Sequence, residues 1–320
     1  MTGWLVAALV VVLWVLAEAK TSRPDGTLVR IPTFRRMLLA VSPQKKDAVV
    51  YFDAAVDATK LLAWLPNARE TLDANVTHAV VGAANIGLAC SPRMNRFVVG
   101  QRIYHRGARF VTFSMKRTVL GPGGEVQNAK LATPKLEMRD GESFADLCAR
   151  INGSVSEQRS GKETATDKEY KLFDMLPRPV LSMAAKLLPL LDHYNLLPAF
   201  FIHDEALYTS MFVANLGSLQ MGPGFHHLYE FGNCPIFLMV GKLEERVVAV
   251  DGVPEVRTIL PLRYTYDERI EDGMNAKFGM EAMVRVLEDP ERWLGGADGA
   301  GVVWPRPDWR SEDGHYDVRP

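Results

Sequence analysis

Residues 212–218 (FVANLGS) and 266–273 (YDERIEDG) decide the fold, because each marks a point where an apolar run ends in polar turn residues. Between them, residues 236–240 (IFLMV) and 257–266 (RTILPLRYTY) are further apolar or β-branched runs, which is typical of sheet strands. The dipeptide Asp251-Gly252 is a hairpin turn signal just before the last run. This half of the chain therefore predicts strands of a sheet.

The segments before this region alternate strand and helix patterns. Residues 48–56 (AVVYFDAAV) predict a strand, residues 59–65 begin an amphipathic helix, and a second helix is expected over 71–89. Two extended runs over residues 96–116 predict a hairpin, with His105-Arg106-Gly107 as its turn. These patterns predict a globular protein that contains both helices and strands, which is an α/β (α+β) fold class.

Two segments interrupt this pattern. Helical spacing over residues 143–151 is followed by a polar stretch, 152–168, which we expect to be a mobile connection, like the loop at 121–124. Residues 170–201 are rich in Leu, Met and Pro, and their prolines predict short helical pieces. These pieces either cap the core or form an apolar lid or membrane-facing surface. An amphipathic helix is expected again over 275–288.

Composition excludes several function classes. Lys and Arg number 37 and Asp and Glu number 38, so the net charge of -1 provides no field to attract nucleic acid. The three cysteines, Cys90, Cys148 and Cys234, fit neither a disulfide framework nor a zinc site and are expected to be buried thiols. Adjacent side chains on a strand point to opposite faces, so residues 203–205 (HDE) are not expected to bind a metal.

Residues 3–17 (GWLVAALVVVLWVLA) form an unbroken apolar run, about 22 Å long as a helix. Three interpretations remain open: a membrane anchor, a signal peptide cleaved near Ala17-Glu18-Ala19, or a helix docked on the domain or on a partner. Basic residues follow the run, so an anchor would leave the remainder in the cytoplasm. We therefore expect membrane contact through residues 3–17 and a cytoplasmic globular domain, with a wholly cytoplasmic protein as the alternative.

The two opening stretches resemble motifs of the 2-oxo-acid dehydrogenase dihydrolipoyl acyltransferase catalytic domain. Residues 212–218 are similar to its F-T-I-S-N-L-G strand and turn, and residues 266–273 stand where it has F-D-H-R-x-x-D-G. The intervening residues 236–262 and the flanking segments 53–64 (DAAVDATKLLAW) and 139–151 (RDGESFADLCARI) agree with the family pattern. The resemblance runs from about residue 30 to residue 295.

The resemblance implies a fold like chloramphenicol acetyltransferase, with a mixed sheet covered by helices. It also implies a homotrimer with active sites between neighbouring subunits, and transfer of an acyl group between coenzyme A and a thiol or hydroxyl. The expected organisation is an apolar N-terminal helix over residues 1–20, a linker over 21–32, the acyltransferase-like domain over 33–295 and a flexible tail over 296–320. The patterns of a lipoyl domain and of phosphate-binding loops are missing from this sequence, and no metal is expected.

The resemblance also implies roles for the residues of this sequence that match the family's motif positions. Asn215 would donate to the tetrahedral oxyanion, and Asp272 would be the structural acid of the loop. Ser218 and Arg269 are expected to contact coenzyme A. Local hydrogen bonding in a turn is the alternative role of Asn215.

Glu268 stands where the family has its catalytic histidine. A carboxylate near pKa 4.3 is a poorer base for a thiol near 8.5 than a histidine near 6.5. Glu268 is therefore a structural residue paired with Arg269 or another Arg, a base retuned for a different acceptor, or a spectator beside another base. In the last case His227 and its neighbour His226 become candidates, although an ordinary loop pair explains them equally.

Overall fold

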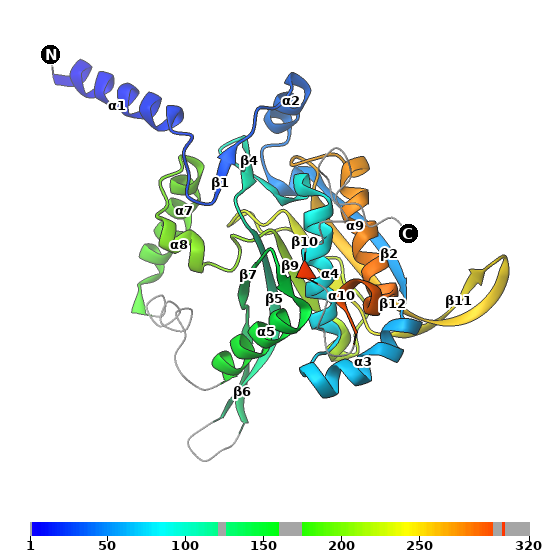
Figure 1. Ribbon diagram of the computed structural model, residues 1–320. Helices are drawn as coiled ribbons and strands as arrows, with labels where there is room; N and C mark the ends of the chain where they lie inside the picture. Colours follow the sequence, from blue (N-terminus) through cyan, green and yellow to red (C-terminus); the bar gives the residue numbers. More distant parts are fainter. Residues whose placement is uncertain (1, 121–125, 160–174, 297–302, 305–320) are drawn as a thin grey trace.

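A mixed sheet forms the centre of the protein (Figure 1). The computed structural model describes residues 2–120, 126–159, 175–296 and 303–304. The eight strands of the sheet run in the order β11-β12-β10-β9-β5-β6, with β2 paired to β12 and β7 paired to β5. β9 lies parallel to both β5 and β10, whereas the remaining pairs are antiparallel. The strands are β2 (Val49–Asp57), β5 (Arg109–Leu120), β6 (Val126–Ala132), β7 (Lys135–Met138), β9 (Met211–Asn215), β10 (Ile236–Val240), β11 (Glu244–Val250) and β12 (Val253–Asp267).

Helices cover one face of this sheet (Figure 1). They are α3 (Thr59–Leu72), α4 (Val76–Cys90), α5 (Phe144–Arg159), α9 (Gly273–Glu288) and α10 (Pro290–Leu294). α4 packs most extensively on α9, because glycines face each other there: a Cβ on Gly87 would lie 2.7 Å from the carbonyl oxygen of Gly279. The main apolar core lies between these helices and the sheet.

The opposite face carries a smaller apolar cluster. Phe212 and Phe237 stack with ring centroids 4.6 Å apart, and Leu228 and Cys234 from the preceding loop pack beside them. Cys90, Cys148 and Cys234 are all buried, as the sequence predicts. The expected mixed sheet and the helices over 59–65, 71–89 and 275–288 are also present, with shifted ends.

A second sheet of three strands follows the order β1-β4-β3, from β1 (Gly26–Leu28), β4 (Arg102–Arg106) and β3 (Arg96–Val99). The predicted hairpin turn at His105-Arg106-Gly107 is wrong. The chain reverses at Gly100 and Gln101, which both adopt positive φ near 56°, and β3 pairs with β4. β5 pairs instead with β6, β7 and β9 of the large sheet.

Two other predictions of loop and helix limits are corrected. α5 continues through the expected polar connection as far as Arg159, while residues 160–168 and the loop at 121–124 lie outside the described residues. Pro189 lies inside the helix α7 (Arg178–His193), which it does not break, and α8 (Ala199–Asp204) follows. Residues 203–205 therefore lie at the end of a helix and not on a strand.

α7 does not simply cap the core. Its side chains Val180, Met183, Leu187 and Leu190 are 40–63% exposed and recur at helical spacing, so this apolar face points to solvent in the single chain. The remaining short elements are α2 (Thr33–Val41), η1 (Lys45–Ala48), η2 (Pro92–Asn95), η3 (Leu216–Leu219), β8 (Glu142–Ser143) and its partner β13 (Val303–Trp304). Most of the expected flexible tail lies outside the described residues.

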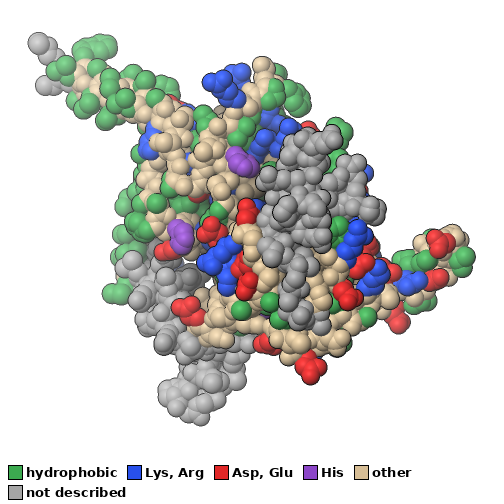
Figure 2. Space-filling model, viewed as in Figure 1, with side chains coloured by type: hydrophobic (Ala, Val, Ile, Leu, Met, Phe, Trp, Pro, Cys, Tyr) green, Lys and Arg blue, Asp and Glu red, His purple; other side chains and the backbone are tan. Residues whose placement is uncertain are grey.

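The apolar run near the N-terminus forms α1 (Thr2–Ala19), which extends away from the domain (Figures 1 and 2). Its large side chains from Trp4 to Leu16 are 51–85% exposed, so the interpretation of a helix docked on its own domain is wrong. Among the described helices, none combines the length and the apolar character needed to cross a membrane. The apolar run is shorter than the roughly 20 residues that a span requires.

Candidate active site

A cavity of about 590 Å³ lies against the end of β12 and the start of α9. Its walls have two chemical characters. One is apolar, from Val29, Ile31, Pro32, Phe34, Leu38 and Ile103. The other is charged, from Arg30, Arg35, Arg93, Arg96, Glu268, Glu271 and Asp272, with Asn275 beside them. Glu268 and Asp272, both predicted as site residues, are brought together here.

Glu271 organises the charged wall. Its carboxylate is 6% exposed and accepts hydrogen bonds from Arg96 Nη1 at 2.9 Å and Arg35 Nη2 at 3.3 Å. Arg93 Nη1 lies 3.6 Å from the same carboxylate. Three guanidinium groups, one from α2 and two from the adjoining η2 and β3, therefore converge on one buried anion, which fixes the positions of Arg35 and Arg96.

Glu268 is held by its backbone. Its N–H donates to the carbonyl of Ala48 at 3.0 Å, and its carbonyl accepts from Arg35 Nη1 at 3.0 Å. Its half-buried side chain lines the cavity, and within the described residues its carboxylate makes no hydrogen bond or ion pair. The carboxylate is thus free to meet a ligand.

Arg269 does not pair with Glu268, so that prediction is wrong. Its guanidinium forms a buried two-point contact with Asp267, with both N···O distances 2.8 Å, and Nη1 also donates to the carbonyl of Pro43 at 2.8 Å. It lines a separate cavity of about 220 Å³ together with Lys45 and Tyr208. The role of Arg269 toward coenzyme A stays a prediction, and these donors are already engaged.

Asp272 begins α9. Its Oδ1 accepts from the N–H of Asn275 at 3.1 Å, which satisfies one of the unpaired donors of the first helical turn. Oδ2 lies 3.6 Å from Arg35 Nη2. Asp272 therefore ties the helix start to the arginine wall.

Asn215 ends β9 and forms the cap of η3. Its Nδ2 donates to Thr77 Oγ1 at 3.0 Å, and its Oδ1 accepts from the N–H of Ser218 at 3.2 Å. Ser218 Oγ in turn donates to the carbonyl of Asn215 at 2.8 Å. A Cβ on Gly217 would lie 2.4 Å from the carbonyl oxygen of Gly241, so the turn packs directly on the next strand end. These contacts give Asn215 the local turn role and leave one amide N–H for a ligand.

Within a single chain, Asn215 and Glu268 do not lie next to each other. Strand pairing places Asn215 opposite Val240, which in turn faces Leu262. Leu262 precedes Glu268 by six residues along the chain, a span of roughly 20 Å at about 3.3 Å per residue. Within one subunit the two predicted residues therefore lie toward opposite ends of the sheet.

The carbonyl of His226 accepts from Thr265 Oγ1 at 2.6 Å, three residues before Glu268 along the chain. His226 stacks on Phe237 with centroids 4.0 Å apart and contacts the carbonyl of His227 through Nδ1 at 2.6 Å. Burial lowers the pKa of His226. His227 is exposed, and neither histidine lines the cavity that contains Glu268. This geometry favours an ordinary loop pair over a substitute base.

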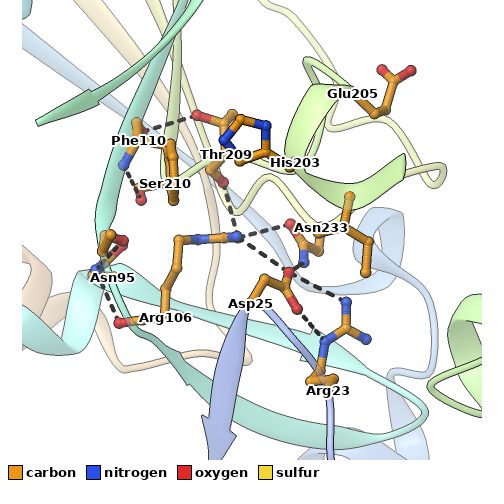
Figure 3. A network of polar contacts seen from close by, with 12 residues as sticks. Arg23, Asp25, Asn95, Arg106, Phe110, His203, Glu205, Thr209, Ser210 and Asn233 are labelled. Carbon is orange, nitrogen blue, oxygen red and sulfur yellow. Dashed lines mark hydrogen bonds and ion pairs between the residues drawn. The ribbon is translucent and has the colours of Figure 1, made fainter. Parts of the chain in front are cut away.

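A buried polar network fixes the segment that forms the apolar wall (Figure 3). Arg23 Nε donates to Asp25 Oδ1 at 2.6 Å, and Asn233 Nδ2 donates to Asp25 Oδ2 at 2.7 Å. Arg106 donates to Asn233 Oδ1 at 2.7 Å and lies 3.4 Å from Asp25. Burial lowers the pKa of Arg106 to about 10 despite the charge of Asp25. The network anchors residues 23–28, so residues 29–35 are held over the cavity.

The sequence reasoning missed the four arginines and Glu271 as site residues. Arg30 follows β1, Arg35 lies in α2, Arg93 lies in η2 and Arg96 is the first residue of β3. No local pattern joins them to Glu271, because the pairs Arg35–Glu271 and Arg96–Glu271 are separated by 236 and 175 residues. Among the residues that the structure describes, no cluster suited to a metal ion is found.

Comparisons with known proteins show which proteins this chain resembles. Residues 205–295 match the family model described as "2-oxoacid dehydrogenases acyltransferase (catalytic domain)". A succinyltransferase component of the 2-oxoglutarate dehydrogenase complex from Rickettsia bellii is 42% identical over 53 residues. That match spans 17% of this chain and 13% of the relative.

Solved structures show the same fold over most of the chain. A probable dihydrolipoamide acetyltransferase from Listeria monocytogenes is 16% identical, with a TM-score of 0.53, and the match covers 82% of this chain and 94% of that one. The dihydrolipoamide acetyltransferase of Azotobacter vinelandii is 18% identical, again with a TM-score of 0.53, over 84% and 95% of the two chains. The expected chloramphenicol acetyltransferase-like fold class is confirmed. The resemblance to the 2-oxo-acid dehydrogenase acyltransferase catalytic domain is confirmed as well.

Proposed function

We propose that this protein is an acyltransferase that passes an acyl group from an acyl-coenzyme A to a thiol or hydroxyl acceptor, with Glu268 as the general base. The observation that carries the proposal is the unpaired Glu268 carboxylate in an arginine-lined cavity. The matched family model, which is that of acyltransferases, supports the reaction type. The acyl group and the acceptor are left open.

The reaction needs two proton transfers, one to Glu268 and one from it, and one exchange of bonds. Glu268 takes the proton from the acceptor S–H or O–H as the acceptor atom attacks the thioester carbonyl carbon. The tetrahedral intermediate then expels coenzyme A thiolate, which recovers the proton from Glu268. The new acyl bond forms as the thioester bond breaks, so atoms and charge balance.

The arginine wall addresses the weakness of a carboxylate base. The ordinary pKa of a free carboxyl group lies about 4 units below that of a free thiol, and the charge of a carboxylate repels the thiolate that it helps to form. Positive groups nearby favour that thiolate, and Arg35 and Arg96 are fixed beside the cavity by Glu271. A hydroxyl or thiol acceptor whose pKa is lowered in this field would be the better match to Glu268.

A complete site requires a second copy of the chain. Asn215 could donate its remaining N–H to the oxyanion only from a neighbouring subunit, because the two residues are roughly 20 Å apart along the strands of one chain. The homotrimer implied by the resemblance provides such a neighbour. Cross-linking and light scattering of the purified chain would test this assembly.

Turnover with a panel of acyl-coenzyme A compounds tests the function. Release of the coenzyme A thiol would be followed with dihydrolipoamide, small thiols and alcohols as acceptors. Glu268→Gln should lower the rate by about 10²–10⁴, since it removes general-base help without changing the shape of the side chain. Glu245→Gln, at an exposed position of β11, is the matched control. The absence of both turnover and coenzyme A binding would reject the proposal.

A non-catalytic scaffold is the second candidate, and the engaged amide of Asn215 favours it. Glu268→His distinguishes the two. Transferase activity that appears only in this variant would identify a decayed site, whereas wild-type activity that is lost in Glu268→Gln would reject the scaffold.

A further inference from the structure

The two sides of α7 are both apolar, but only one of them packs on the protein. On the inner side, Leu188 and Leu191 pack against the buried cluster that includes Tyr208. Four side chains of the outer side recur at helical spacing and are 40–63% exposed: Val180, Met183, Leu187 and Leu190. The inner side therefore holds the helix on the domain, and the outer side presents a convex apolar face to the surroundings.

A second apolar surface adjoins this face at the base of α1. The carbonyl of Lys20 accepts from Asn195 Nδ2 at 2.9 Å, and Arg23 Nη1 lies 3.0 Å from Asp192 of α7, so the end of α1 is joined to the end of α7. Figure 2 shows hydrophobic side chains along α1 and along the side of the molecule where Figure 1 places α7 and α8. An exposed apolar surface that extends over two adjoining helices indicates an interaction site.

The charges on α7 indicate which kind of partner it meets. Its exposed charged side chains are Arg178 and Lys186, whereas its only acidic residue, Asp192, is buried. On α8, Asp204 is exposed, but its carboxylate lies 2.8 Å from Nδ1 of His203. An amphipathic helix whose exposed charges are basic suits the interface of a bilayer with anionic headgroups.

A second copy of the chain fits the same face poorly. Lys186 lies near the middle of α7, beside Met183 and Leu190 at helical spacing. In a two-fold symmetric pair of antiparallel α7 helices, the two Lys186 side chains would lie at the same edge of the contact, and α7 has no exposed acid to separate them. Like charges placed together oppose association, whereas a lipid surface places no cation opposite Lys186.

We propose that α7 lies on an anionic lipid surface, in the plane of one leaflet. Its outer apolar face contacts the acyl chains, and Arg178 and Lys186 contact the headgroups. α1 adds its apolar side chains to the same contact, because its base is joined to the end of α7. The contact requires no helix to span the bilayer. It is also independent of the proposed transfer reaction, so the test needs no turnover.

An environment-sensitive dye on α7 tests this contact in the full chain. The cysteine introduced by Leu187→Cys can be labelled selectively, because Cys90, Cys148 and Cys234 are buried. The dye should gain fluorescence when vesicles of equimolar phosphatidylcholine and phosphatidylglycerol are added, and a nitroxide-bearing lipid in the vesicles should quench it. Val247→Cys is the matched control: Val247 is 71% exposed on β11, on the opposite side of the molecule in Figure 1, and its dye should not respond.

Charge variants of the labelled chain test the preference for anionic lipid. Arg178→Gln combined with Lys186→Gln should weaken binding to the mixed vesicles by about tenfold, since each basic side chain near an anionic surface adds attraction. Binding to vesicles of phosphatidylcholine alone should change by less than about twofold. Lys60→Gln combined with Lys277→Gln is the control, because it removes the same charge from two lysines that are each 66% exposed on α3 and α9.

Several results would overturn the proposal. A dye at position 187 that responds to vesicles no more than the dye at position 247 would do so, because α1 alone would then account for any binding. A dye that reports apolar surroundings without lipid would also do so. Loss of that signal on dilution of the protein would assign the face to a second copy, and its persistence would assign the face to the chain itself. An equal loss of vesicle binding in the control pair of lysines would reject the role of Arg178 and Lys186.

Discussion

Replacing Asp25 by Asn should destabilise the protein strongly, because Asp25 neutralises two buried arginines at once. Its carboxylate accepts from Arg23 at 2.6 Å and lies 3.4 Å from Arg106, and these two side chains are 0% and 1% exposed. Asp192, which is 3.0 Å from Arg23, remains as a buried counter-charge. The variant therefore leaves two cations facing one anion away from water.

Removing one partner of a buried ion pair typically costs about 3–5 kcal/mol, and we expect a value in this range for Asp25→Asn. Typical domains are stable by about 5–15 kcal/mol, so the change should be plain in a urea titration followed by circular dichroism. Asp53→Asn is the control: Asp53 is 63% exposed and pairs with Arg263, so its loss should cost at most about 1 kcal/mol. Equal costs for the two variants would refute the reasoning.

The stability of the Asp25→Asn variant should also depend on pH differently from that of the wild-type chain. Burial alone would raise the pKa of Asp25, but the hydrogen bonds and charges of Arg23 and Arg106 hold it below its ordinary value. The stability that Asp25 contributes is therefore present above the unfolded-state pKa of about 3.9 and is lost as the pH falls through the lower folded-state pKa. The acid limb of the stability curve should flatten in Asp25→Asn, and an unchanged limb would show that the carboxylate is not held in its charged form.

Three further predictions concern the site and its surroundings. Glu271→Gln leaves three guanidinium groups without their shared buried anion and should lower the free energy of unfolding by about 3 kcal/mol, measured in urea. Gly217→Ala should lower the melting temperature because its Cβ would meet the carbonyl of Gly241, whereas Gly222→Ala, with open space around it, should leave stability within about 0.5 kcal/mol. Burial raises the pKa of Asp192, despite Arg23, so its contribution to stability falls as the pH rises from the ordinary carboxyl pKa through the raised one. Asp192→Asn should remove that slope in unfolding curves taken across mildly acidic pH, and a slope that persists would contradict the assignment.

Local patterns predicted the sheet strands near the two motifs well. The run IFLMV is β10 with the same ends, and Asp251-Gly252 forms the expected turn, with φ near 49° and 81°. A strand depends on its run of apolar side chains, a turn on residues that allow the chain to reverse, and a helix start on a capping side chain. Residues that are neighbours in the sequence determine all three. The helix α9 begins at Gly273 for the same reason, since Asp272 caps it.

Three element ends were predicted wrongly, because local sequence patterns did not determine them. The turn was predicted at His105-Arg106-Gly107, with Gly100-Gln101 within an extended run, whereas the chain reverses at Gly100-Gln101 so that β3 pairs with β4. In α5, polar residues continue a helix whose buried residues lie near its start, so polarity alone did not mark its end. Pro189 occupies the last part of α7 without ending it.

The sequence by itself determined the fold class and the family resemblance, and with them the positions of Asn215, Glu268 and Asp272. Only the tertiary structure decided which charges meet: Arg269 pairs with Asp267, whereas Glu268 remains unpaired beside an arginine wall. The physical reason is the separation along the chain over which each interaction acts. Hydrophobic periodicity and turn chemistry act over a few residues, whereas Arg35 of α2 and Glu271, in the turn between β12 and α9, meet across 236 positions where both line one cavity.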